Sequence, residues 1–234
     1  MQIGVVTFPG SNCDVDTVKA LTDLGVQAVV IDYRNHRLDY LSAAIIPGGF
    51  SYGDYLRSGA LAARAPVMAA LRDAVEEQKL PVLGICNGFQ ILTEAGLLPG
   101  VLRPNRHGEF RCDWQTLRVA AESPYFPGLR VGDRLRMPIA HGEGAYYTPP
   151  GSLQALFQAG QAWLQYTDDQ GQLHALTNPN GSVANLAGIQ QGSVAALMPH
   201  PERAMHRYLG SDDGHKLLSA WIDGIRQEVG HARV

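Results

Sequence analysis

The chain has 234 residues, enough for one large α/β domain or two small ones, with a core that needs no disulfide or metal support. Hydrophobic residues make up 45%, charged residues 18%, and the formal net charge is -3, so the composition gives no reason to expect nucleic acid or an anionic membrane as partner. Three widely spaced cysteines argue against a disulfide framework. Neither a signal-peptide pattern nor a membrane-length apolar run is present, so we expect a cytoplasmic protein.

The first half alternates short apolar runs with helical periodicity, which is typical of βαβ units around a parallel sheet. Helices are expected after a capping box at Ser11 to Asp14, from Pro66, and directly after Cys86. Gly25 is expected to end the first of them. The predicted strands are Gln2–Thr7, Val26–Asp32, Ala43–Gly49 and Leu80–Ile85.

The second half has shorter alternating segments with many turn residues, which indicate antiparallel or mixed strands that extend the first sheet. The strands expected there are Thr116–Ala121, Gln161–Thr167 and Gly192–Pro199, and a closing helix is expected from about Asp212. No flexible linker separates the halves, so the sequence predicts a single domain over residues 1–234. The predicted fold is α/β, a flavodoxin-like three-layer sandwich with a largely parallel central sheet.

Cys86 stands between a predicted strand and a predicted helix in the pattern Gly84-Ile85-Cys86-Asn87-Gly88. This is the context of a nucleophile elbow, in which glycines let strand and helix approach closely and the turn strains the nucleophile. The helix N-terminus favours thiolate over thiol. The alternative is a buried apolar cysteine, which is the commoner fate of a free thiol.

His200 and Glu202 are the candidate partners of this cysteine, in the segment "MPHPERA". Residues two apart in an extended segment project to the same side, and the flanking prolines favour that conformation. A carboxylate beside an imidazole fixes its tautomer, so Cys86, His200 and Glu202 have the composition of a catalytic triad. Taken alone, a His and a Glu at this spacing are weak evidence for catalysis, because most of the eight histidines are expected to be structural or exposed.

A glycine-rich loop, Ile45–Gly59, follows the third predicted strand. It lacks the ending of a P-loop and is not a dinucleotide fingerprint. Backbone N–H groups at Gly48 and Gly49, together with that of Asn87, instead suit an oxyanion hole, although a surface turn would explain the loop if it stood alone. No metal-binding spacing is present, so no metal site is predicted.

Together, "PGGFSYGD", "GICNGFQ" and "MPHPERA" resemble the motifs of class I glutamine amidotransferases. The segments "VVTFPGSNCDVD", "GGFSYGD" and "AHGEGAYY" make the chain similar to the glutaminase subunits of phosphoribosylformylglycinamidine synthases. This resemblance implies hydrolysis of glutamine to glutamate and ammonia through a thioester on Cys86. It also implies that substrate and oxyanion are bound by Gly48, Gly49, Phe50, Asn87 and Gln90.

The same resemblance implies two partners, a large synthetase subunit that receives the ammonia and a small bridging subunit. ATP and Mg²⁺ are then expected on the synthetase and no cofactor in this chain, which has no ATP-binding motif. His141 and Glu143 belong to the segment specific to these subunits and are expected near the subunit contact or the ammonia exit. The segment Asn105–His107 is assigned no role.

Three alternatives remain open at the level of sequence. A subunit of another amidotransferase would share the triad but not "GGFSYGD" and "HGEG". A cysteine hydrolase of the DJ-1/PfpI type would lack the distal "HPE". A non-catalytic scaffold subunit with the same fold would release no ammonia from glutamine.

Overall fold

Five parallel strands form the first part of the central sheet, and four antiparallel strands extend it. The parallel strands are β1 (Gln2–Thr7), β2 (Gln27–Asp32), β3 (Ala43–Ile46), β4 (Val82–Ile85) and β11 (Val194–Leu197). The antiparallel strands are β6 (Arg111–Val119), β7 (Arg134–His141), β9 (Ala162–Thr167) and β10 (Leu186–Gln191). In this computed structural model, which describes residues 1–231, their order is β2-β1-β3-β4-β11-β10-β9-β6-β7.

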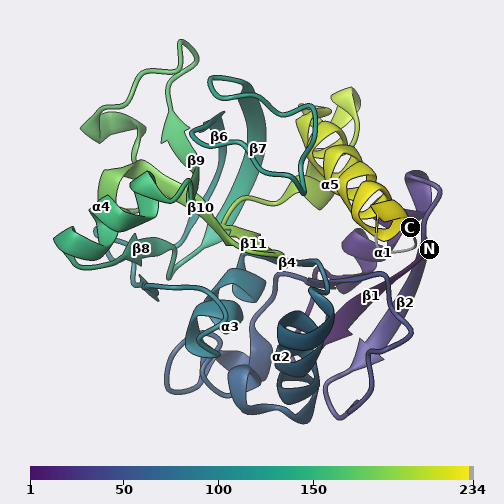
Figure 1. Ribbon diagram of the computed structural model, residues 1–234. Coiled ribbons are helices and arrows are strands. Elements are labelled where there is room, and N and C mark those ends of the chain that lie inside the picture. Colours follow the sequence, from purple (N-terminus) through teal and green to yellow (C-terminus); the bar gives the residue numbers. More distant parts are fainter. Residues whose placement is uncertain (232–234) are drawn as a thin grey trace.

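Helices cover both faces of the parallel strands, as Figure 1 shows, with α2 (Pro66–Gln78) and α3 (Asn87–Glu94) on one side. On the other side lie α1 (Asp14–Asp23) and α5 (Asp213–His231) (Figure 1). The five parallel strands have the 2-1-3-4-5 order of flavodoxin-like folds. This arrangement confirms the predicted three-layer α/β fold with antiparallel strands in the second half.

The remaining elements are peripheral to this sandwich. Helix α4 (Pro150–Gln158) precedes β9, and β5 (Val101–Arg103) pairs with β8 (Ala145–Tyr147) in a separate two-stranded sheet. Short 3-10 helices are η1 (Ser51–Asp54), η2 (Ala62–Arg64), η3 (Ala175–Thr177), η4 (Val183–Asn185), η5 (Pro201–Arg203) and η6 (Arg207–Leu209). None of the described helices is long and apolar enough to cross a membrane.

Two local expectations were wrong. Helix α1 begins at Asp14 with Cys13 at its N-cap and no side-chain cap, and the Ser11 hydroxyl instead accepts the Phe8 N–H at 3.0 Å. Ser11 also forms an isolated antiparallel bridge with Gly49. Strand β3 ends at Ile46 rather than Gly49, since Pro47 has no N–H with which to continue the ladder.

The core lies on both faces of the sheet. Trp163 in β9 and Trp221 in α5 are completely buried, and the apolar face of α5, which also contains Leu217, Leu218, Ile222 and Ile225, packs inward. Each large apolar side chain buried in this way stabilises the fold by roughly 1.5–3 kcal/mol. The sandwich therefore supplies a rigid support for the loops at its edge.

Candidate active site

Four loops meet at the carboxyl edge of the parallel strands. Cys13 follows β1, Gly48 follows β3, Cys86 follows β4 and His200 follows β11. Because neighbouring parallel strands end at the same edge, residues far apart in the sequence are brought together there. This is the edge at which open α/β sheets bind their ligands.

Cys86 occupies a strained turn between β4 and α3. Its φ of 50° and ψ of -104° are unfavourable for a residue with a side chain, and its N–H donates to the Leu197 carbonyl at 2.8 Å. A Cβ on Gly84 would lie 2.5 Å from the Leu92 side chain, and one on Gly88 would overlap the Ile46 carbonyl oxygen. Both glycines are thus needed for the close packing of strand and helix, as expected for a nucleophile elbow.

Cys86 also lines a hollow of about 290 Å³, which we call the catalytic pocket. The thiol is 5% exposed and its Sγ lies 3.6 Å from the Ala140 carbonyl oxygen. The walls of the catalytic pocket include Gly49, Phe50, Cys86, Gln90, His141 and Glu143. Of the residues expected at the site, Gly49, Phe50 and Gln90 therefore share one pocket with the thiol, whereas the described pocket wall does not include Gly48, Asn87, His200 and Glu202.

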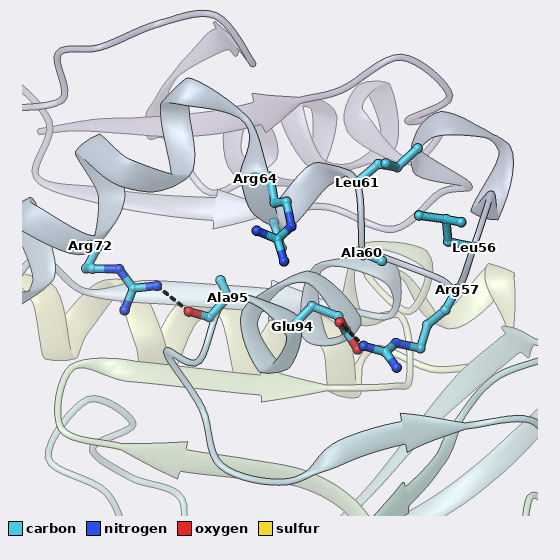
Figure 2. Close-up of a pocket in the computed structure, with 9 residues that line it drawn as sticks. Leu56, Arg57, Ala60, Leu61, Arg64, Arg72, Glu94 and Ala95 are labelled. Carbon is cyan, nitrogen blue, oxygen red and sulfur yellow. Dashed lines mark hydrogen bonds and ion pairs between the residues drawn. The ribbon is translucent and has the colours of Figure 1, made fainter.

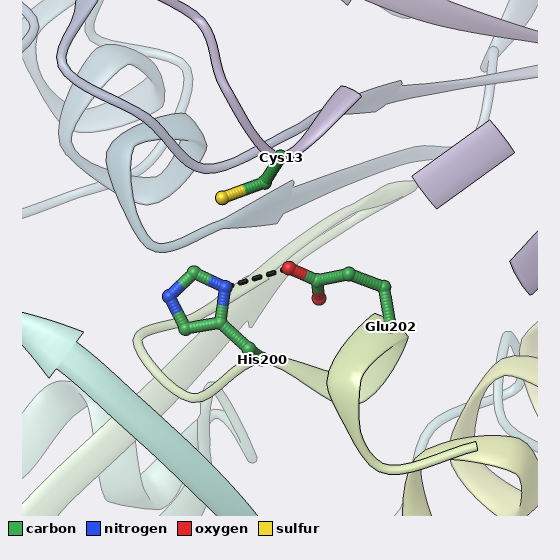
Figure 3. Close-up of side chains that lie close together, drawn as sticks. All are labelled: Cys13, His200 and Glu202. Carbon is green, nitrogen blue, oxygen red and sulfur yellow. Dashed lines mark hydrogen bonds and ion pairs between the residues drawn. The ribbon is translucent and has the colours of Figure 1, made fainter. Parts of the chain in front are cut away.

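His200 and Glu202 form a buried pair beside this pocket (Figure 3). His200 Nδ1 lies 2.6 Å from Glu202 Oε1, and the two side chains are 1% and 0% exposed. Burial alone would lower the pKa of His200, but the Glu202 carboxylate and two neighbouring thiols raise it well above its ordinary value. His200 Nε2 has no hydrogen-bond partner among the described residues, so it is free to exchange a proton with a reacting group.

Cys13 is a second thiol at His200, and sequence reasoning missed it. Its Sγ, a ring nitrogen of His200 and a carboxylate oxygen of Glu202 lie within 4.8 Å of one another, and Figure 3 shows the sulfur directed toward the imidazole. The Arg203 guanidinium donates to Cys13 Sγ at 3.1 Å. That cation and the short His200–Glu202 bond disfavour a divalent metal at this cluster. The position of Cys13 at the end of the loop between a predicted strand and a predicted helix was the available signal.

Gly48 lies at the centre of these groups. A Cβ there would be 2.8 Å from His200 Cε1, 3.0 Å from Cys13 Sγ and 3.4 Å from Cys86 Cβ. Among the described residues, no hydrogen bond engages the N–H of Gly49 or of Asn87. The Phe50 N–H, in contrast, already donates to the Gly10 carbonyl at 3.0 Å, so this geometry argues against Phe50 as an oxyanion donor.

The side chains of Gln90 and Asn87 are hydrogen-bonded to each other. Asn87 Nδ2 donates to Gln90 Oε1 at 2.8 Å, while Asn87 Oδ1 accepts the Ser51 N–H at 3.2 Å. Gln90 Nε2 donates to the Glu143 carbonyl at 2.6 Å. Gln90 therefore links α3 to the opposite wall of the pocket. Both its Oε1 and its Nε2 form hydrogen bonds within the protein.

Asn105, to which no role was assigned, positions the segment that contains His141. Its Nδ2 donates to the His141 carbonyl at 2.8 Å, and its Oδ1 accepts from Gly144 N at 3.0 Å and His141 Nδ1 at 3.2 Å. Burial, followed by the charge on His200, lowers the pKa of His141 to about 4. His141 is therefore neutral near pH 7, with Nε2 unprotonated because Nδ1 holds the proton.

A larger hollow of about 490 Å³ lies beside the loop that follows η1 (Figure 2). Arg57, Arg64 and Arg72 line it, and Arg57 is paired with Glu94 at 2.5 Å. None of its lining residues is a nucleophile, so the chemistry belongs to the smaller catalytic pocket.

Comparisons with known proteins show the family of this chain. The chain is 51% identical over 236 residues to the phosphoribosylformylglycinamidine synthase subunit PurQ of Thermomicrobium roseum, with 99% of each chain covered. It is 47% identical to the same subunit of Pyrococcus horikoshii, with 97% of this chain and 100% of that one covered. The family of CobB/CobQ-like glutamine amidotransferase domains matches residues 1–223. The chain belongs to the PurQ family of glutamine amidotransferases.

Solved structures agree with the PurQ assignment. A chain in the structure of PurLQS from Thermotoga maritima superposes with a TM-score of 0.84 at 38% identity, covering 95% of this chain and 97% of that one. A putative GMP synthase subunit from Thermoplasma acidophilum, at 16% identity and a TM-score of 0.64, shares the fold alone. The comparisons therefore confirm the resemblance inferred from the sequence motifs. They favour PurQ over a subunit of another amidotransferase and over a DJ-1/PfpI hydrolase.

Proposed function

We propose that this protein is the glutaminase subunit of a phosphoribosylformylglycinamidine synthase and hydrolyses L-glutamine to glutamate and ammonia for purine biosynthesis. The observation that carries the proposal is the elbow thiol of Cys86 in a pocket beside the buried His200–Glu202 pair. Its membership of the PurQ family supports the choice of reaction.

Cys86 is the nucleophile in this proposal. Its thiolate attacks the side-chain amide carbon of glutamine, and the N–H groups of Gly49 and Asn87 stabilise the oxyanion. The His200 imidazolium, held by Glu202, protonates the departing nitrogen so that ammonia leaves and a γ-glutamyl thioester remains. Neutral His200 then takes a proton from water, hydroxide attacks the thioester, and glutamate is released as the thiol is restored.

The ammonia is delivered to a partner in this proposal. PurQ relatives are named as subunits, and one solved relative is part of a PurLQS structure. We place ATP and Mg²⁺ on a large synthetase subunit that converts formylglycinamide ribonucleotide to formylglycinamidine ribonucleotide, with a small bridging subunit between them. This chain needs no cofactor of its own for thiol chemistry, and we place the complex in the cytoplasm because its three cysteines are free.

The test compares glutamate release by the unmodified protein and Cys86→Ala, each with the synthetase partner added. Loss of the nucleophile is expected to lower kcat by about 10⁴-fold or more. Cys112→Ala is the matched control, because Cys112 is an exposed thiol outside the catalytic pocket. Equal activity of the Cys86→Ala variant and the parent would refute the assignment of the nucleophile.

A further inference from the structure

Two carboxylates line the catalytic pocket without any role in the thiol chemistry. Asp54, at the end of η1, and Glu143, after β7, both belong to its wall, as does Cys86. The two acids lie close enough for the charge on Glu143 to raise the pKa of Asp54, after the larger effect of burial and against a hydrogen bond from Ser58. Buried carboxylates are costly unless they are paired or hydrogen-bonded, so this pair favours a ligand that brings hydrogen-bond donors or a positive charge.

Among the described residues, no cation forms an ion pair with either acid. Glu143 Oε2 accepts the Ser58 N–H at 3.3 Å, and Asp54 Oδ1 is buried without a hydrogen-bond partner. Arg57 lies three residues after Asp54, and the charge on Glu143 contributes to its raised pKa, but its guanidinium is paired with Glu94 on the larger hollow (Figure 2). No Lys or Arg belongs to the described wall of the catalytic pocket.

The backbone that presents Asp54 is strained. Tyr52, Asp54 and Leu56 all have left-handed φ values, of 54°, 54° and 69°. Each such residue costs on the order of 1–3 kcal/mol and persists only where surrounding contacts enforce it, which happens typically at ligand sites. The loop is thus held in a conformation that directs a carboxylate to the pocket at the expense of stability.

The remaining unpartnered group in the wall is also an acceptor. His141 is 3% exposed, and its Nε2 has no partner among the described residues. Since its Nδ1 proton is held by Asn105 Oδ1, Nε2 can only accept. The unsatisfied groups Asp54 Oδ1 and His141 Nε2 therefore both require hydrogen-bond donors from the ligand. An amino acid with a side-chain amide brings two such groups, a cationic ammonium and an NH₂.

We propose that Asp54 and Glu143 bind the α-ammonium group of the amino-acid substrate and make the pocket selective for free glutamine over N-acylated glutamine. The inference rests on the proposed function, in which the side-chain amide of the same molecule faces Cys86. The ammonium donates to the unpaired oxygens and offsets one of the two negative charges of the pair, while the strained loop fixes its distance from the thiol. Asp54 and Glu143 thus act in binding and leave the chemistry to Cys86, His200 and Glu202.

The experiment measures alkylation of Cys86 by two electrophiles in the presence of the partner subunits. One probe is 6-diazo-5-oxo-L-norleucine, which carries the α-ammonium of glutamine, and the other is iodoacetamide, which lacks it. For Asp54→Asn and Glu143→Gln, we expect the second-order rate with the first probe to fall about ten- to a hundredfold, because a charge-assisted hydrogen bond is lost. The rate with iodoacetamide is expected to stay within about twofold, and Glu77→Gln, an exposed acid on α2, is the control.

Glutamine hydrolysis gives a second readout, in which the two variants raise KM with little change in kcat. Unchanged labelling by the glutamine analogue, or an equal fall with both probes, overturns the assignment of the ammonium site, since an equal fall reports a distorted pocket. Failure of the analogue to label Cys86 in the unmodified protein, with iodoacetamide labelling intact, is a different result. It overturns the proposed function itself, and the ammonium site with it.

Discussion

The thiols of Cys13 and Cys86 both lie close to the His200 imidazole, but they differ in their surroundings. Cys86 has strained backbone angles and lines the catalytic pocket, whereas Cys13 caps α1 and its sulfur accepts from Arg203. A nucleophile must reach the substrate, and Cys13 is not part of the described pocket wall. This arrangement supports Cys86 as the proposed nucleophile, whereas Cys13 contacts His200 and contributes to its raised pKa.

The His200–Glu202 pair makes stability dependent on pH. Because the pKa of His200 is raised in the folded protein, the stability it contributes is complete below its unfolded pKa and is lost as pH rises through the folded value. Glu202→Gln is expected to cost about 3–5 kcal/mol near pH 6, since one partner of a buried pair remains. Urea unfolding of parent and variant at about pH 6 and about pH 9.5 should show that difference shrinking at the higher pH. A difference that grows with pH would contradict this.

At the scale of elements, the unit formed by β4, Cys86 and α3 depends on the distance between strand and helix. Gly88 packs its Cα directly against the Ile46 carbonyl of β3, with no room for a methyl group. Helix α3 thereby points its N-terminus, with the Asn87 N–H, at the edge where the substrate reacts. The glycines at positions 84 and 88 are thus required by the same close approach of β4 and α3 that places Cys86 and the Asn87 N–H at this edge.

Gly88→Ala is expected to destabilise the protein by about 1–3 kcal/mol, because the added methyl must displace backbone. Gly151→Ala in the first turn of α4 is a matched control, since a Cβ there meets nothing within 4 Å. That substitution should be neutral or stabilising by up to about 1 kcal/mol. Denaturant midpoints of the two variants provide the measurement, and equal midpoints would refute the packing argument.

These elements also show how far the sequence alone could lead. The parallel strands and the motif around Cys86 were predictable, because continuous apolar runs and glycines at fixed offsets have direct physical causes. Strand β7 was not predicted: its buried Leu135, Met137 and Ile139 alternate correctly, but Pro138 within the run disguises them. Asn105 and Asp54 were not assigned, since their roles depend on loops that only the folded sheet brings together.

At the scale of the whole molecule, β11 joins the two halves of the chain. This strand comes late in the sequence but lies between β4 and β10, so the parallel and antiparallel parts share one sheet. Without β11, the backbone N–H and C=O groups along the facing edges of β4 and β10 would lack hydrogen-bond partners, so each part of the sheet depends on the other. The shared sheet supports the prediction of a single domain over residues 1–234.

We predict that both halves unfold together. Trp114, Trp163 and Trp221 report on the second half through fluorescence, and the buried thiols Cys13 and Cys86 report on the first through their reactivity. Cooperative unfolding requires the two probes to give one midpoint in urea. Separate midpoints would show two independently stable units and refute the single-domain prediction.

The place of β11 also sets the order in which the active site appears during synthesis. Cys86 and its strand are made early, whereas His200 is made only after the antiparallel strands β6, β7, β9 and β10. The chain is synthesised from its N-terminus at about 5–20 residues per second. In the proposed mechanism, a nascent chain thus carries its thiol before the imidazole that activates it, and the ability to consume glutamine requires translation to continue past Glu202.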